Sequence, residues 1–68
     1  MKALYDMMDY NIAEELGVDV ETYIELIENK CSAEDANFII MTLLTDDTDN
    51  LEKAKETFNK YLNEQNGN

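Results

Sequence analysis

Apolar residues recur at every third or fourth position along most of this 68-residue chain, which is the spacing of amphipathic helices. No proline interrupts the pattern, and the only glycines are Gly17 and Gly67. The apolar–polar alternation that marks a half-buried strand is scarce. We therefore predict an all-α fold, a compact bundle of four to five short helices, with one domain over residues 1–64 and a flexible C-terminal tail over 65–68.

The first predicted helix covers roughly residues 2–16, followed by Gly17, which suits the left-handed turn that often ends a helix. Its apolar positions follow steps of four: Leu4, Met8, Ile12 and Leu16. The sequence leaves open a break near Asp9-Tyr10-Asn11, where Asp9 or Asn11 could cap a second short helix.

Three further helices are predicted over about 20–30, from Ser32 to Leu44, and over about 49–64. Asp19 is the natural N-cap of the first of these, and Ser32 with Asp35 resembles a capping box at the start of the second. The helix after Ser32 has the widest apolar stripe, so we expect it to be the most buried. Residues 45–50 are predicted to form a loop and a cap.

The charge is strongly acidic and unevenly distributed. Sixteen acidic residues face five lysines, with no arginine or histidine, giving a net charge of −11. Fourteen of these acids lie in residues 1–52, where only Lys2 and Lys30 oppose them, whereas residues 53–68 carry +1. Direct binding to nucleic acid or to an anionic membrane is disfavoured, whereas a basic protein surface would be attracted. Solubility alone is the alternative explanation of this acidity.

One acidic row is concentrated on a single predicted helix face. Glu21, Glu25 and Glu28 fall within about 60° of one another on an α-helix. Like charges at this spacing cost roughly 0.2–0.5 kcal/mol per pair, so a sequence shaped for stability alone would alternate signs. A solvated helix face is the competing interpretation. The candidate partner-binding residues are Glu14, Glu15, Asp19, Glu21, Glu25 and Glu28.

Residues 11–28 resemble the helix-turn-helix of phage repressors and related regulators. Ala13 matches the small residue packed inside the first helix of that family, and Gly17 matches the turn glycine four positions later. Ile12, Leu16, Val18 and Leu26 fit the flanking apolar positions. The second helix of the family enters the major groove with polar and basic side chains, but here it presents glutamates. The resemblance therefore implies the packing of such a domain and not its DNA binding.

Other chemistries find weak support. Asp46, Asp47, Asp49, Asn50 and Glu52 lack the alternation and the glycine of a calcium loop. Cys31 has no histidine to activate it, and neighbouring Lys30 is expected to lower its pKa slightly. We expect no enzyme activity, no cofactor and no metal. Four residues are open to either core or surface placement, with core favoured: Tyr5, Met7, Met8 and Tyr10.

The functional hypothesis is a small acidic cytoplasmic protein that occupies a basic surface of a nucleic-acid-handling protein or nuclease complex. In size and acidity the chain is similar to phage-encoded inhibitors of host defence, such as anti-restriction and anti-CRISPR proteins. The alternatives are a repressor-like dimerisation or adaptor module without DNA binding, and a small structural assembly protein. A homodimer that hides part of the methionine and tyrosine surface is compatible with each of them.

Overall fold

The computed structural model describes residues 5–66 and, for Asn66, the backbone alone. Within this range the protein is all-α, with four helices and no strands. Helix α1 (Met7–Leu16) begins at a capping box, in which the Asp6 carboxylate accepts from the Asp9 N–H and the Asp9 carboxylate accepts from the Asp6 N–H. The break that the sequence leaves open near Asp9-Tyr10-Asn11 does not occur, because Asp9 completes the first turn of a continuous helix.

Helix α2 (Val20–Glu25) follows a tight turn at Gly17, whose φ of 79° is the left-handed conformation that glycine adopts at low cost. Asp19 caps α2 as predicted, accepting a 3.0 Å hydrogen bond from the Thr22 N–H. The next five residues form a π-helical segment, η1 (Leu26–Lys30), where a regular α-helix was predicted. Its wider turn is closed by a 2.7 Å bond from the Cys31 N–H to the Leu26 carbonyl.

Helix α3 (Ala33–Leu44) starts at Ser32, whose hydroxyl accepts from the Asp35 N–H at 3.1 Å. The Asp35 carboxylate accepts instead from the hydroxyl of Tyr61, 26 residues further on, at 2.5 Å. This bond ties the start of α3 to the second half of helix α4 (Leu51–Asn66). Helix α4 extends to Asn66, two residues into the segment 65–68 that was predicted to be a flexible tail, and residues 67–68 lie outside the described part.

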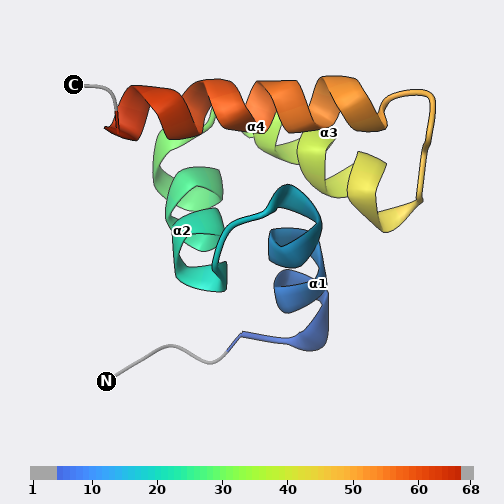
Figure 1. Cartoon of the computed structure of the whole chain (residues 1–68), viewed down its shortest axis with the longest axis horizontal. Helices are drawn as coiled ribbons and strands as arrows, with labels where there is room; N and C mark the ends of the chain where they lie inside the picture. The colour runs from blue at the N-terminus through green and yellow to red at the C-terminus, as the bar shows by residue number, and fades with distance from the viewer. Residues whose placement is uncertain (1–4, 67–68) are drawn as a thin grey trace.

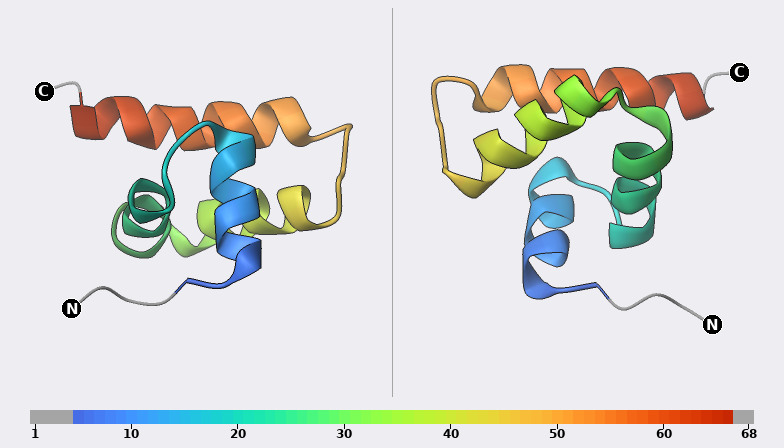
Figure 2. Two further views of the ribbon diagram at one scale, coloured as in Figure 1. Left: turned by 60° about the horizontal axis from the view of Figure 1, so that its bottom comes forward. Right: turned by 180° about the vertical axis from the view of Figure 1, so that it is seen from behind.

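The helices form two pairs. Helices α3 and α4 pack against each other, and α1 and α2 lie together on one side of them (Figure 1). Helix α1 also contacts α3, whereas η1 contacts α4. The left view of Figure 2 shows α2 almost end-on while α1 runs from top to bottom, so these two helices cross steeply. None of the helices described is long and apolar enough to cross a lipid bilayer.

Every element contributes to a small core, in which the rings of Tyr23 and Phe58 lie 6.3 Å apart. The buried cluster consists of Ile12, Ala13, Tyr23, Leu26, Ile39, Ala54 and Phe58. Burial of Ala13 shows why a small residue is needed where α1 crosses α2. The stripe predicted on α3 is only partly buried, because Met41 and Leu44 remain 52% and 46% exposed.

Candidate functional site

An open groove between the start of α1 and the outer face of α2 and η1 contains all three glutamates of the predicted row. Its volume is about 360 Å³. We call it the acidic groove, and it is lined by Tyr5, Asp9, Glu21, Ile24, Glu25, Glu28 and Asn29. The prediction that Glu21, Glu25 and Glu28 share one face is confirmed, although η1 departs from α-helical geometry.

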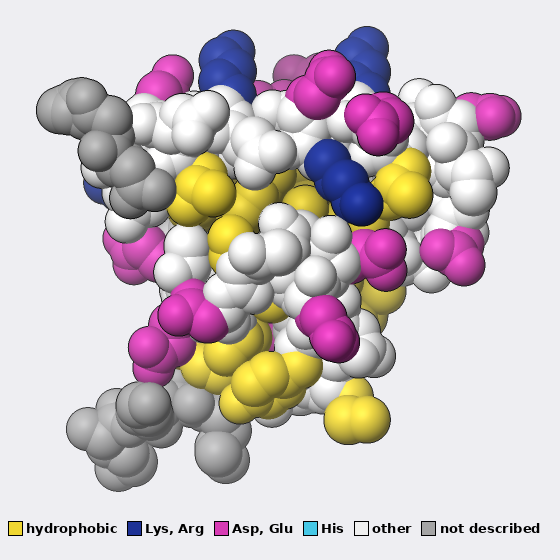
Figure 3. Space-filling view, in the orientation of Figure 1, with side chains coloured by type: hydrophobic (Ala, Val, Ile, Leu, Met, Phe, Trp, Pro, Cys, Tyr) yellow, Lys and Arg dark blue, Asp and Glu magenta, His cyan; other side chains and the backbone are white. Residues whose placement is uncertain are grey.

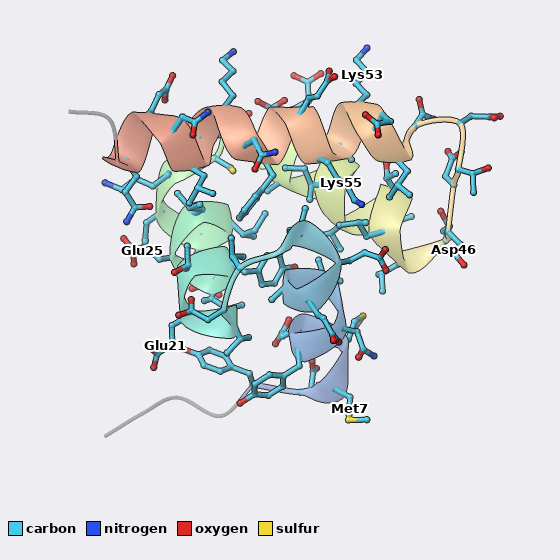
Figure 4. The ribbon with its side chains drawn as sticks, in the orientation of Figure 1. Met7, Glu21, Glu25, Asp46, Lys53 and Lys55 are labelled. Atoms are coloured by element: carbon cyan, nitrogen blue, oxygen red, sulfur yellow. The ribbon has the colours of Figure 1, made fainter. Side chains whose placement is uncertain are left out.

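Helix α2 holds Glu21 and Glu25 outward and η1 carries Glu28, while Tyr23 of α2 and Leu26 of η1 enter the core. Glu21 and Glu25 project from the same edge of α2, away from α3 and α4 (Figure 4). The side-chain amide of Asn29 donates a 2.9 Å hydrogen bond to the Glu25 carboxylate, one helical turn back. This bond limits the rotamers of Glu25 and leaves its second oxygen available as an acceptor.

The three remaining predicted residues lie elsewhere. Asp19 caps α2, and its hydrogen bonds from Thr22 lower the pKa of its carboxyl. Glu15 lines a separate groove on another face of α1, where four of the six lining residues are apolar. Glu14 is exposed on α1 and lines neither groove. The six candidate partner-binding residues are therefore divided between different faces of the molecule.

Sequence reasoning missed Tyr5 and Asp9 as parts of the acidic groove. A signal was present, because Asp9 lies three and four residues before Ile12 and Ala13, on the face of α1 that packs against α2. The ring of Tyr5 meets that of Tyr10 edge-on, with centroids 6.2 Å apart. Met7, Met8 and Tyr10 are 77%, 43% and 52% exposed, so the favoured placement of these residues in the core is wrong.

Negative charge is not confined to the acidic groove. On the face shown in Figure 3, carboxylates occur around most of the outline, whereas the lysines lie mainly over α4. Lys53 points away from the other helices, and Lys55 points from α4 towards the end of α1 (Figure 4). The acidic groove is thus one part of a broadly acidic surface, and it is distinguished by its concave shape.

The other candidate chemistry of the sequence finds little structural basis. Burial raises the pKa of the Cys31 thiol, and the charge of Asp35 raises it further, so the predicted lowering by Lys30 is wrong. Among the described residues, no three acidic, cysteine or histidine side chains are arranged to hold a metal ion. In the acidic loop, the Asp47 carboxylate accepts a 2.8 Å bond from the Asn50 amide, which stabilises the turn before α4.

Comparisons with known proteins leave the fold and the acidic groove as the basis for interpretation. No protein-family model matches the chain, and neither the curated proteins nor the solved structures yield a match.

Proposed function

We propose that this protein binds a basic, nucleic-acid-binding surface of another protein and blocks it by electrostatic and steric competition, without catalysis. The observation that carries the proposal is the acidic groove, where Glu21, Glu25 and Glu28 stand beside Asp9 on one concave face. The α1–α2 hairpin would serve as a scaffold of the helix-turn-helix kind. Its second helix would carry carboxylates at the place where the recognition helix of DNA-binding helix-turn-helix proteins carries polar and basic side chains.

The spacing of the carboxylates supports this mimicry. Glu21 and Glu25 lie four residues apart on α2, about 6 Å along the helix axis, which gives about one negative charge per 6 Å in that part of the row. A DNA strand presents one phosphate per about 3.4 Å of axis, so the row is somewhat less dense than the natural ligand. Asp9 adds a fourth charge from the neighbouring helix. A row of lysines or arginines that holds a phosphate backbone could therefore pair with this groove.

A displacement experiment tests the proposal directly. Duplex DNA is immobilised, loaded with DNA-binding proteins from a cell lysate, and then treated with the purified chain at constant ionic strength. We expect a defined subset of proteins to be released and to form a complex with the chain in a second, purified assay. Because the contact is between opposite charges, release should weaken as salt rises.

Two triple variants with equal charge separate the groove from the overall acidity. Replacing Glu21, Glu25 and Glu28 by Gln should abolish release, whereas replacing the exposed Glu34, Glu52 and Glu56 by Gln should leave most of it. Gln keeps the size of each side chain and can still accept the bond from Asn29. Equal release by the two variants would show that net charge alone acts. Salt-insensitive self-association without release would favour the dimerisation or assembly alternative.

A further inference from the structure

A second groove, between α1 and the C-terminal end of α3, has a different chemistry. We call it the apolar groove, and its volume is about 320 Å³. It is lined by Met8, Asn11, Ile12, Glu15, Leu43 and Leu44. Ile12 is almost fully buried beneath it, whereas Met8 and Leu44 are 43% and 46% exposed. Apolar side chains from α1 and α3 thus remain partly exposed along a concave surface, beside the polar side chains of Asn11 and Glu15.

We propose that the apolar groove binds an amphipathic helix of a partner protein whose apolar stripe is flanked by lysine or arginine. The α1 side of the groove is formed by positions i, i+3, i+4 and i+7, from Met8 to Glu15, over roughly 10 Å. A partner helix lying along this length would place about two turns in contact. This geometry is that of helix-in-groove recognition, where apolar anchors recur at helical spacing.

Charge complementarity determines which helix would bind. Glu15 is the one charged side chain among the described residues that line the apolar groove, and the chain around it carries −11. A basic flank on the incoming helix would be attracted to this wall and to the surrounding field. A second copy of this chain would bring the same excess of negative charge, so long-range repulsion opposes a homodimer here.

This inference goes beyond the proposed function because it concerns a different face of the molecule. Asp9 in the acidic groove and the centre of the apolar groove are separated by roughly 110° around the α1 axis. Either groove can therefore be altered without changing the other. Failure of one proposal would leave the other intact.

The probe is a synthetic amphipathic peptide of leucine and lysine, with leucines at helical spacing, titrated calorimetrically into the full chain. The matched control peptide has glutamate in place of every lysine. We expect the lysine peptide to bind with a dissociation constant in the range of about 1–100 μM and the glutamate peptide to show no binding. Binding of both peptides, or of neither, would overturn the proposal.

Paired variants locate the binding site. Leu44→Gln should weaken binding about tenfold, whereas Met41→Gln, at a methionine that is equally exposed but outside the groove, should not. Glu15→Gln should weaken binding about two- to fivefold at low salt, with Glu14→Gln as its control. All four sites are exposed, and unchanged circular dichroism would show that each variant is folded.

Three results would contradict the inference. If Leu44→Gln and Met41→Gln bound the peptide equally well, the groove would not be the site. If binding were lost only when Glu21, Glu25 and Glu28 became Gln, the peptide would occupy the acidic groove instead. If the free chain self-associated and Leu44→Gln abolished that association, the occupant would be a second copy.

Discussion

Tyr23 shows how one side chain couples the acidic surface to the core. Its ring is buried beside Phe58. Loss of solvation, with additional contributions from the charges of Asp9 and Asp6, raises the pKa of Tyr23 to about 12. The packing of α1 on α2 therefore brings the N-cap Asp6 and the first-turn Asp9 of α1 near a buried phenol. Burial and these neighbouring negative charges both disfavour the ionisation of Tyr23.

We predict a specific loss of stability at alkaline pH from this residue. The unfolded tyrosine loses its proton near pH 10, whereas the native one keeps it to about pH 12. Between these values the unfolded state binds fewer protons, so the free energy of unfolding falls as pH rises. The stabilising contribution is complete below pH 10 and is lost as pH approaches 12. Urea unfolding at several pH values from 9 to 11.5 would measure this fall.

The slope of the free energy of unfolding against pH tests this prediction more directly than the stability at any one pH. Tyr23→Phe should reduce the slope because it removes the titrating hydroxyl. Tyr10→Phe is the control, since Tyr10 is 52% exposed and lies outside the buried cluster. An unchanged slope in Tyr23→Phe would mean that the alkaline loss arises from other groups.

Exposure of single residues was the least predictable feature of the structure. Met41 and Leu44 continue the apolar stripe of α3, and Met8 belongs to that of α1, so periodicity alone favours burial for all three. Periodicity shows that side chains share a face, but it does not show whether another helix covers that face. The helices of this short chain do not cover all their apolar positions, and part of the uncovered surface forms the apolar groove.

At the scale of the elements, helix starts were predictable where the deciding contact is local. Asp19 and Ser32 each accept a bond from an N–H three residues ahead, so the sequence contains the whole interaction. The Asp6–Asp9 box is equally local, but it was missed because Leu4 extends the apolar pattern upstream of Met7. The bond between Tyr61 and Asp35 and the π-helical geometry of η1 depend on tertiary packing, which local patterns do not contain.

The end of α3 offers a test of helix termination. Asp46 adopts a φ of 58°, the left-handed conformation normally taken there by glycine. The following N–H, that of Asp47, donates a 3.1 Å bond to the Thr42 carbonyl, which completes a Schellman-type ending. Asp46→Gly should raise the free energy of unfolding by about 0.5–1 kcal/mol, because glycine lacks the Cβ that disfavours this conformation. Urea denaturation at neutral pH would measure the change.

Asp46→Asn separates backbone strain from charge in this experiment. Asn removes one negative charge but keeps a Cβ, so it should stabilise less than Gly. Equal stabilisation by the two variants would assign the effect to charge instead of to backbone conformation.

At the scale of the whole molecule, net charge and size act together. The chain extends 38 × 31 × 21 Å, so charges on opposite sides interact when the screening length is about 30 Å, as at 0.01 M salt. At 0.1 M the screening length falls to about 10 Å, and only neighbouring carboxylates still repel. A net charge of −11 therefore opposes folding over the whole molecule at low salt, but mainly within local clusters near physiological salt.

We predict opposite effects of salt on stability and on binding. Raising NaCl from 10 to 300 mM should raise the melting temperature by several degrees, equivalent to about 1 kcal/mol, with most of the gain below 100 mM. Replacing Glu34, Glu52 and Glu56 by Gln should reduce this gain, because fewer charges remain to be screened. Over the same range, binding of a basic partner in the acidic groove should weaken. A fall in melting temperature with salt would contradict this prediction, because it would show that attractive ion pairs outweigh repulsion in the native state. Weaker binding at high salt would then reflect unfolding of the chain instead of screened attraction.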